Sequence, residues 1–128
     1  MKAEELASLL DIATEAALAG GAILQAYWGK LESIQEKGRT GDLLTEADQL
    51  AEAAVLKVIQ RHFPDHQILA EESGQLGDLD SPYLWAIDPL DGTTNYAHQY
   101  PFSSTSVGLL HYGVPQVGAI LDPFHNDL

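Results

Sequence analysis

The chain has 128 residues, 45% of them hydrophobic, and a formal net charge of -13 from 6 Lys and Arg against 19 Asp and Glu. This length suits one domain, and the hydrophobic share excludes a generally disordered chain. Because so acidic a protein repels nucleic-acid backbones and anionic lipids, we expect neither nucleic acid nor membrane as a partner. The chain lacks cysteine, and its apolar runs look too short to cross a bilayer. We therefore expect a cytoplasmic protein in which oxygen or imidazole would hold any metal.

Residues 3–28 are predicted to form the first helix, because their apolar side chains recur at helical spacing. Gly20 and Gly21 interrupt this stretch, which indicates either close helix packing or a local bend. The following residues, 29–42, are polar and rich in turn formers. They contain a possible strand at 31–35 and a flexible loop at 37–42.

Residues 45–63 form the clearest predicted helix, which Thr45 begins as a cap and Pro64 ends. Asp48 lies three residues after Thr45, in the position of a capping box. Capping alone would explain Asp48, since a carboxylate also suits the positive end of a helix dipole. A carboxylate in that first turn can equally hold a water bound to a metal.

Two short apolar strands are predicted next, at residues 67–70 and 83–87. The first ends in Glu71 and Glu72, and the second ends in Asp88 and Pro89. Proline cannot donate to a strand ladder, so we expect the second strand to stop there. Residues 75–82 between them are expected to be a surface loop. Carboxylates at the ends of both strands are expected to converge on one site.

The turn after the second strand carries the densest group of polar atoms. Asp88, Asp91 and the carbonyl of Leu90 place three hard oxygen donors in a small volume. Asp-Pro and Asp-Gly are also common turn dipeptides, so an ordinary solvated turn is the alternative.

A short helix is predicted from Asp91 onward, with Asp91 as its acidic cap. Gly92 lets the backbone come close to a ligand. The amides of Gly92, Thr93 and Thr94 at such a helix start suit an anion, phosphate above all.

Residues 104–112 and 114–121 are predicted to form a hairpin about Gly113, and Pro115 indicates an edge strand. The five histidines show no metal-ligand spacing. The fold class is therefore predicted as α+β, with two long helices packed on a largely antiparallel sheet.

Four carboxylates each lie at the end of a predicted element: Asp48, Glu71, Asp88 and Asp91. An all-oxygen set suits Mg²⁺ better than zinc. Divalent cations would also reverse the local sign of so acidic a surface for a phosphorylated substrate. Two such ions can activate a water and stabilise the leaving alkoxide of a phosphate ester.

Three segments in order resemble the inositol monophosphatase family, whose superfamily also holds fructose-1,6-bisphosphatase. They are residues 44–48 (Leu-Thr-Glu-Ala-Asp), 70–73 (Ala-Glu-Glu-Ser) and 88–96 (Asp-Pro-Leu-Asp-Gly-Thr-Thr-Asn-Tyr), the last followed by Pro101 and Phe102. The resemblance covers essentially the whole chain. It implies the N-terminal part of a layered αβαβα sandwich, usually dimeric, and a Mg²⁺-dependent phosphomonoesterase of inositol monophosphate or a related sugar or polyol phosphate.

The resemblance also implies the ligands of the metal ions. Glu71, Asp88 and the carbonyl of Leu90 would hold the first Mg²⁺. Asp88 would bridge to a second ion that Asp91 also holds. Lys37 lies in the loop that in this family helps to close the site.

The same resemblance implies the catalytic and substrate-binding residues. Thr93 and Asp48 would orient the attacking water, with Glu71 beside it. The N–H groups of Gly92 and Thr93 would receive the phosphate, with Thr94 next to them. The triplet 93–95 (Thr-Thr-Asn) is similar to the inositol monophosphatase branch rather than to the nucleotide-phosphatase branch.

The sequence departs from the family in one respect, since it lacks the Trp-Asp-x-Ala-Ala/Gly motif that completes the second metal site. We therefore expect residues 1–128 to be the N-terminal portion of an inositol monophosphatase-like domain. Alone, this portion is expected to have little or no activity and to associate as a homodimer or with a missing C-terminal half.

Three alternatives remain open at this point. The first is a fructose-1,6-bisphosphatase-like or nucleotide-phosphate phosphatase of the same superfamily. The second is a non-catalytic domain that uses the same carboxylates to bind a metal or a partner. In the third, Asp48 is only a cap and the two aspartates of segment 88–91 form only a turn.

Overall fold

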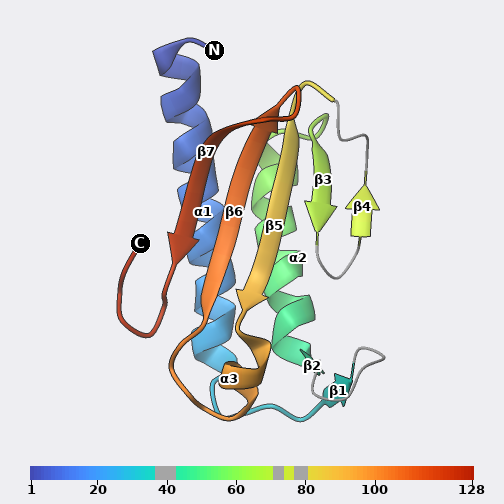
Figure 1. The fold of residues 1–128 in the computed structure, drawn as a ribbon, viewed down its shortest axis with the longest axis vertical. Coiled ribbons are helices and arrows are strands. Elements are labelled where there is room, and N and C mark those ends of the chain that lie inside the picture. Colours follow the sequence, from blue (N-terminus) through green and yellow to red (C-terminus); the bar gives the residue numbers. More distant parts are fainter. Residues whose placement is uncertain (37–42, 71–73, 77–80) are drawn as a thin grey trace.

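A five-stranded sheet carries two long helices on one of its faces (Figure 1). The computed structural model describes the whole chain except residues 37–42, 71–73 and 77–80. The helices are α1 (Ala3–Tyr27), α2 (Glu46–His62) and the short α3 (Thr93–Ala97). The strands are β1 (Ile34–Glu36), β2 (Leu43–Thr45), β3 (Gln67–Ala70), β4 (Gly74–Leu76), β5 (Leu84–Asp91), β6 (Ser104–His111) and β7 (Val114–Leu121).

The sheet has the strand order β4-β3-β5-β6-β7, and β1 pairs separately with β2. Only the β3–β5 pair is parallel among the described strands, and all other pairs are antiparallel. The predicted α+β class, with two long helices on a largely antiparallel sheet, is confirmed. The β6–β7 hairpin is confirmed as well, and β7 lies at the edge of the sheet, as Pro115 indicated.

The main core lies between the helices and the sheet. It is built from small side chains of α1, branched side chains of α2 and large side chains of the strands, among them Ala13, Ala16, Val55, Ile59, Trp85, Val107 and Leu109. At Gly20 the helix approaches so closely that an added Cβ would lie 2.9 Å from Val55 and 2.8 Å from Thr105. The Gly20–Gly21 pair therefore serves close helix packing, the first of the two interpretations.

Helix α1 is long and apolar enough to cross a bilayer, by length and composition alone. By this measure, the expectation that no apolar run is long enough to cross a bilayer does not hold. Seven residues of α1 are buried, and they pack against α2 and the sheet: Leu9, Ala13, Ala16, Ala17, Gly20, Gly21 and Leu24.

Several predicted boundaries differ from the structure. The possible strand at residues 31–35 is displaced, since β1 covers Ile34–Glu36. The stretch 75–82 was expected to be a loop, yet Gly74–Leu76 pairs with β3 as an edge strand. A segment of three residues is too short to show the alternation of apolar and polar residues that predicts a strand. It forms a strand because it pairs with β3. Lys37 and Glu71 lie outside the described residues.

Candidate metal and phosphate site

Strand β5 does not stop at Asp88 and Pro89 as predicted, but continues to Asp91. Asp88 pairs with Ser106 of β6 and Asp91 pairs with Ser104. Two residues of β5, Pro89 and Leu90, therefore lie opposite one residue of β6, which is the arrangement of a β-bulge. A bulge is a position where a strand tolerates proline, because the ladder is already interrupted there.

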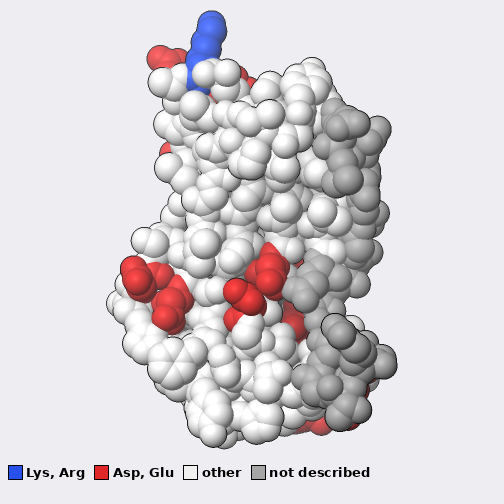
Figure 2. Space-filling model, in the orientation of Figure 1, with Lys and Arg blue, Asp and Glu red and all other residues white. Residues whose placement is uncertain are grey.

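The bulge places the two aspartates on the same face of the sheet. Side chains alternate along a regular strand, so residues three apart would point to opposite faces. Here Asp88 and Asp91 pair with Ser106 and Ser104, which are two apart on β6 and so share one face. That face is the one turned away from α1 and α2, since the intervening Thr105 is buried toward the helices. Figure 2 shows acidic side chains gathered on this face near the lower end of the sheet.

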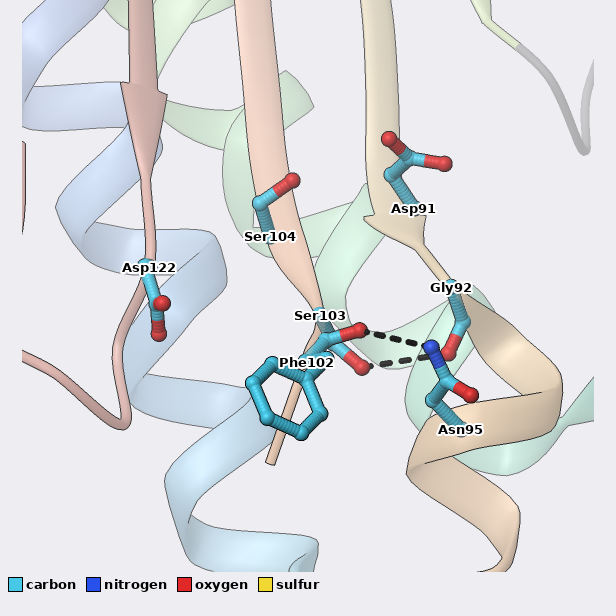
Figure 3. A pocket seen from close by; sticks show the side chains of 7 residues that line it. All are labelled: Asp91, Gly92, Asn95, Phe102, Ser103, Ser104 and Asp122. Atoms are coloured by element: carbon cyan, nitrogen blue, oxygen red, sulfur yellow. Dashed lines mark hydrogen bonds between the residues drawn. The ribbon is translucent and has the colours of Figure 1, made fainter. Parts of the chain in front are cut away.

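Immediately after β5 the backbone turns at Gly92, which has a φ of 88°. This left-handed conformation favours glycine, and a Cβ there would lie 2.8 Å from the carbonyl oxygen of Phe102. Gly92 is the N-cap of α3, so the prediction that Asp91 caps this helix is wrong. The Ser103 hydroxyl donates to the Gly92 carbonyl at 3.1 Å, and Asn95 Nδ2 donates to the Phe102 carbonyl at 3.1 Å (Figure 3).

The capping box at the start of α2 is present and also reaches the site. The Thr45 N–H and hydroxyl donate to Asp48 Oδ2 at 2.8 and 2.7 Å, and Thr45 Oγ1 accepts from the Asp48 N–H at 3.4 Å. The other carboxylate oxygen, Asp48 Oδ1, lies 3.0 Å from the Thr93 hydroxyl. Asp48 is only 1% exposed. Its capping role and its contact with Thr93 therefore exist together.

The Thr93 hydroxyl has two acceptors for its single proton. Besides Asp48 Oδ1, the Leu90 carbonyl oxygen lies 3.2 Å from Thr93 Oγ1. This contact joins the start of α3 to the bulge, so the two predicted parts of the site are connected directly.

Tyr96 fixes α3 to the first helix. Its ring is fully buried, and its hydroxyl donates to the Leu24 carbonyl at 2.7 Å. Burial, together with the negative charges of Asp48 and Glu46, raises the pKa of Tyr96 far above its ordinary value of 10.0. The hydroxyl therefore stays a donor and holds α3 in place.

A cavity of about 410 Å³ opens beside the end of β5. It is lined by Asp91, Gly92, Asn95, Phe102, Ser103, Ser104 and Asp122 (Figure 3). Asp122 was not predicted as a site residue. It follows β7, and its Oδ1 accepts from the N–H groups of Phe124 and His125 at 3.0 and 3.1 Å. Burial raises the pKa of Asp122, but hydrogen bonds, chiefly from the His125 side chain, outweigh it and hold this pKa below its ordinary value. The signal that could have identified Asp122 in the sequence is the Asp-Pro pair that directly follows the predicted strand.

The donor set of the bulge fits a hard divalent cation. Asp88, Asp91 and the Leu90 carbonyl supply only oxygen, and no described Lys or Arg pairs with Asp91. Mg²⁺ commonly binds proteins through one or two carboxylates and keeps several waters. Among the residues that the structure describes, no three His, Cys, Asp or Glu side chains cluster as a metal site. The third predicted carboxylate, Glu71, lies outside that part of the chain.

Comparison with known proteins gives a consistent picture. A model described as the inositol monophosphatase family matches residues 5–128. An inositol-1-monophosphatase of Synechocystis is 60% identical over 97% of this chain and 43% of its own length. A fructose-1,6-bisphosphatase/inositol-1-monophosphatase of Aquifex aeolicus is 42% identical over 98% of this chain and 47% of its own.

A solved structure agrees with the sequence relatives. The inositol monophosphatase of Anabaena has a TM-score of 0.79 and 60% identity, over 95% of this chain and 42% of that one. The chain thus spans less than half the length of each of these relatives.

Proposed function

The chain belongs to the inositol monophosphatase family, and on that premise we propose that it carries the metal- and phosphate-binding elements of a Mg²⁺-dependent phosphomonoesterase. The proposed substrate is inositol monophosphate or a related sugar or polyol phosphate. The observation that carries the proposal is the bulge of β5, which turns Asp88 and Asp91 to one face beside the contact of Asp48 with Thr93.

Asp88, Asp91 and the Leu90 carbonyl are the residues proposed to hold Mg²⁺, with Glu71 completing the set. When bound, the cation would neutralise phosphate charge and lower the pKa of a bound water. The chain's net charge of -13 makes such neutralisation a requirement for any phosphorylated substrate.

Thr93 and Asp48 are proposed to orient the attacking water. Because the Thr93 proton points to Asp48 Oδ1 or to the Leu90 carbonyl, the lone pairs of Oγ1 can accept a hydrogen bond from a water. Asp48 cannot rotate freely, since Oδ2 is held by the capping box. A water held on Thr93 would keep its oxygen directed toward the phosphorus, which is the positioning that phosphoryl transfer needs.

The start of α3 is proposed to receive the phosphate. The N-cap residue is Gly92, which has no side chain that could accept a hydrogen bond from the first amides of α3. The N–H groups of Gly92 and Thr93 are therefore proposed to bind the phosphate, with Thr94 next to them. The left-handed turn at Gly92 directs the backbone from β5 straight into α3. The phosphate would therefore lie next to the two aspartates of the bulge.

The Aquifex relative, named as both a bisphosphatase and a monophosphatase, supports fructose 1,6-bisphosphate as the second candidate substrate. A nucleotide phosphate and a non-catalytic metal- or partner-binding role stay as further alternatives. A homodimer and a cytoplasmic location stay predictions.

The test is phosphate release from inositol 1-phosphate, with and without Mg²⁺, by the whole protein that carries this chain and by residues 1–128 alone. Fructose 1,6-bisphosphate and a nucleotide phosphate serve as competing substrates. We expect Mg²⁺-dependent release of phosphate from the inositol ester by the whole protein. Residues 1–128 alone are expected to release no phosphate. Turnover by them would contradict the expectation that activity also needs the C-terminal metal-ligand motif.

Metal binding is tested separately by the shift of the unfolding temperature with Mg²⁺. Asp91→Asn is expected to abolish the shift. Asp11→Asn, an exposed change on α1, is the matched control and is expected to retain it. An unchanged shift in the Asp91 variant would favour the ordinary-turn alternative.

A further inference from the structure

Thr105 lies at the point of β6 that faces the bulge. It is the single residue opposite Pro89 and Leu90, between the pairs that Asp88 and Asp91 form with β6. Its side chain has no exposed surface, and its hydroxyl donates to the Pro89 carbonyl at 2.8 Å. The hydrogen bond therefore joins β6 to the extra residue of the bulge at a fully buried position.

Helix α1 restricts the side chain of Thr105 from the other side. A Cβ on Gly20 would lie 2.8 Å from Thr105 Cγ2 and 3.3 Å from Thr105 Oγ1. β-Branched side chains are already limited at χ1, and close contact with a helix backbone limits them further. The hydroxyl is thus held in the orientation that reaches Pro89.

The bulge could in principle form one residue earlier or later along β5, since a bulge needs only two residues opposite one. A displaced bulge would make Asp88 or Asp91 one of its two bulged residues, so that this aspartate would lose its regular pairing with Ser106 or Ser104 and the spacing of the two carboxylates would change. A donor aimed at the Pro89 carbonyl favours the observed position over its neighbours.

We propose that Thr105 is a positioning residue that fixes the bulge and thereby sets the spacing of Asp88 and Asp91, and so the affinity of the site for a divalent cation. This inference rests on the proposed function for its cation, and on the geometry of β5 and β6 for the bulge. Partners that orient metal ligands from behind commonly change metal affinity by about 10- to 100-fold when they are removed.

The experiment compares Thr105→Val and Thr105→Ser in the whole protein that carries this chain. Valine keeps the shape and removes the donor, whereas serine keeps the donor. We expect Thr105→Val to weaken Mg²⁺ binding, measured by calorimetric titration, by about 10-fold or more. Thr105→Ser is expected to restore the affinity to within about 3-fold of the parent protein, because its hydroxyl can still donate to Pro89.

A second readout does not depend on metal. Hydrogen exchange of the backbone amides of residues 90–92, measured without Mg²⁺, is expected to be faster in Thr105→Val than in the parent and near normal in Thr105→Ser. Tyr83→Phe is the matched control, because it also removes one hydroxyl hydrogen bond, to Glu5 at 2.6 Å, but at the far end of β5. It is expected to change neither readout at the bulge.

Unchanged Mg²⁺ affinity and unchanged exchange in a folded Thr105→Val protein would overturn the proposal. If that variant folds too poorly to titrate, Gly20→Ala replaces it, since the added methyl displaces Thr105 without removing its hydroxyl. An unchanged Mg²⁺ affinity in Gly20→Ala would likewise overturn the proposal. If the parent protein binds no Mg²⁺, the proposed cation fails, and the exchange measurement alone decides whether Thr105 holds the bulge.

Discussion

The carboxylate of Asp48 and the hydroxyl of Thr93 meet at 3.0 Å although 45 residues separate them in the chain. One oxygen of Asp48 is used for the capping box of α2, and the other is used for this contact. A single carboxylate therefore begins a helix and joins that helix to the turn after β5. Loss of Asp48 affects the stability of α2 and the proposed orientation of water together.

Asp48→Asn tests this double role. The amide keeps the shape but loses an acceptor, so we expect the free energy of unfolding to fall by about 1 kcal/mol, as for other lost caps. Phosphatase activity of the whole protein is expected to fall by about 100-fold or more, because the Thr93 hydroxyl loses its orientation. Chemical denaturation and phosphate release measure the two effects.

The control for this prediction is a double-mutant cycle with Thr93→Val. If the two residues act together, the double variant is expected to be little less active than either single variant. Additive losses of activity would contradict a shared role. Full activity in a folded Asp48→Asn protein would show that Asp48 serves only as a helix cap.

Gly20→Ala is expected to destabilise the protein, contrary to helix propensity. Alanine normally stabilises a helix interior relative to glycine by about 1 kcal/mol. Here the new methyl meets Val55 and Thr105, two β-branched side chains with little freedom to move, so we expect a net loss of about 1–3 kcal/mol. Gly21→Ala is the comparison, because it meets chiefly the flexible end of Leu121 and is expected to cost less. A urea midpoint of Gly20→Ala equal to or above that of the parent protein would contradict the expected effect of close packing at Gly20.

A comparison of Gly92→Ala with Gly113→Ala separates the cost of a positive φ from the cost of a steric clash. Both Gly92 and Gly113 have positive φ, 88° and 78°, so alanine at either position costs about 1–2 kcal/mol. Only at Gly92 does a Cβ also meet a backbone carbonyl, that of Phe102. We expect Gly92→Ala to lose more stability than Gly113→Ala and to lose activity as well. Thermal unfolding of the two variants measures the difference, and an equal loss would indicate that only φ matters.

His66 gives the fold a pH dependence. Its ring stacks between those of Phe63 and Tyr83 at centroid distances of 4.3 and 4.4 Å, and its Nδ1 accepts from Trp85 Nε1 at 3.0 Å. Burial lowers the pKa of His66 below its ordinary value of 6.5, against the opposing charge of Asp65. The unfolded chain therefore takes up the proton more readily, and stability is expected to fall as the pH drops below 6.5.

Urea denaturation at pH 7.5 and pH 5.5 checks this expectation. His66→Gln retains an acceptor but does not titrate, so its stability is expected to change less between the two pH values. The same change in the parent protein and in the variant would show that other groups cause it.

The long helices, the β6–β7 hairpin and the capping box were predictable because their signals are local. Apolar spacing places the helices, and Thr45 and Asp48 lie within one turn of each other. The bulge was not predictable from its own segment, because Pro89 there reads as the end of a strand. Its stability depends on Thr105, which is 16 residues farther along the chain.

Two further features depend on contacts that local patterns do not contain. Strand β4 exists because β3 offers it an edge, and Asp122 joins the cavity because β7 pairs with β6. The predicted roles of Asp88, Leu90 and Asp91 as metal ligands, and of Glu71, stay predictions. What the structure adds is that the bulge brings the two aspartates to one face.

The bulge also determines which changes of chain length this architecture can accept. An insertion at the turn about Gly113 lies at the far end of β6 and leaves the pairing of Asp88 and Asp91 unchanged. Removing either Pro89 or Leu90 would leave one residue of β5 opposite Thr105, so the strand would be regular. The two aspartates would then be two residues apart in the chain, without a bulge. Both would still share a face and could keep their pairing with Ser106 and Ser104, but the strand between them would have one backbone carbonyl fewer. The extra residue of the bulge thus leaves the positions of the two aspartates along β6 unchanged and adds a backbone carbonyl between them, next to the start of α3.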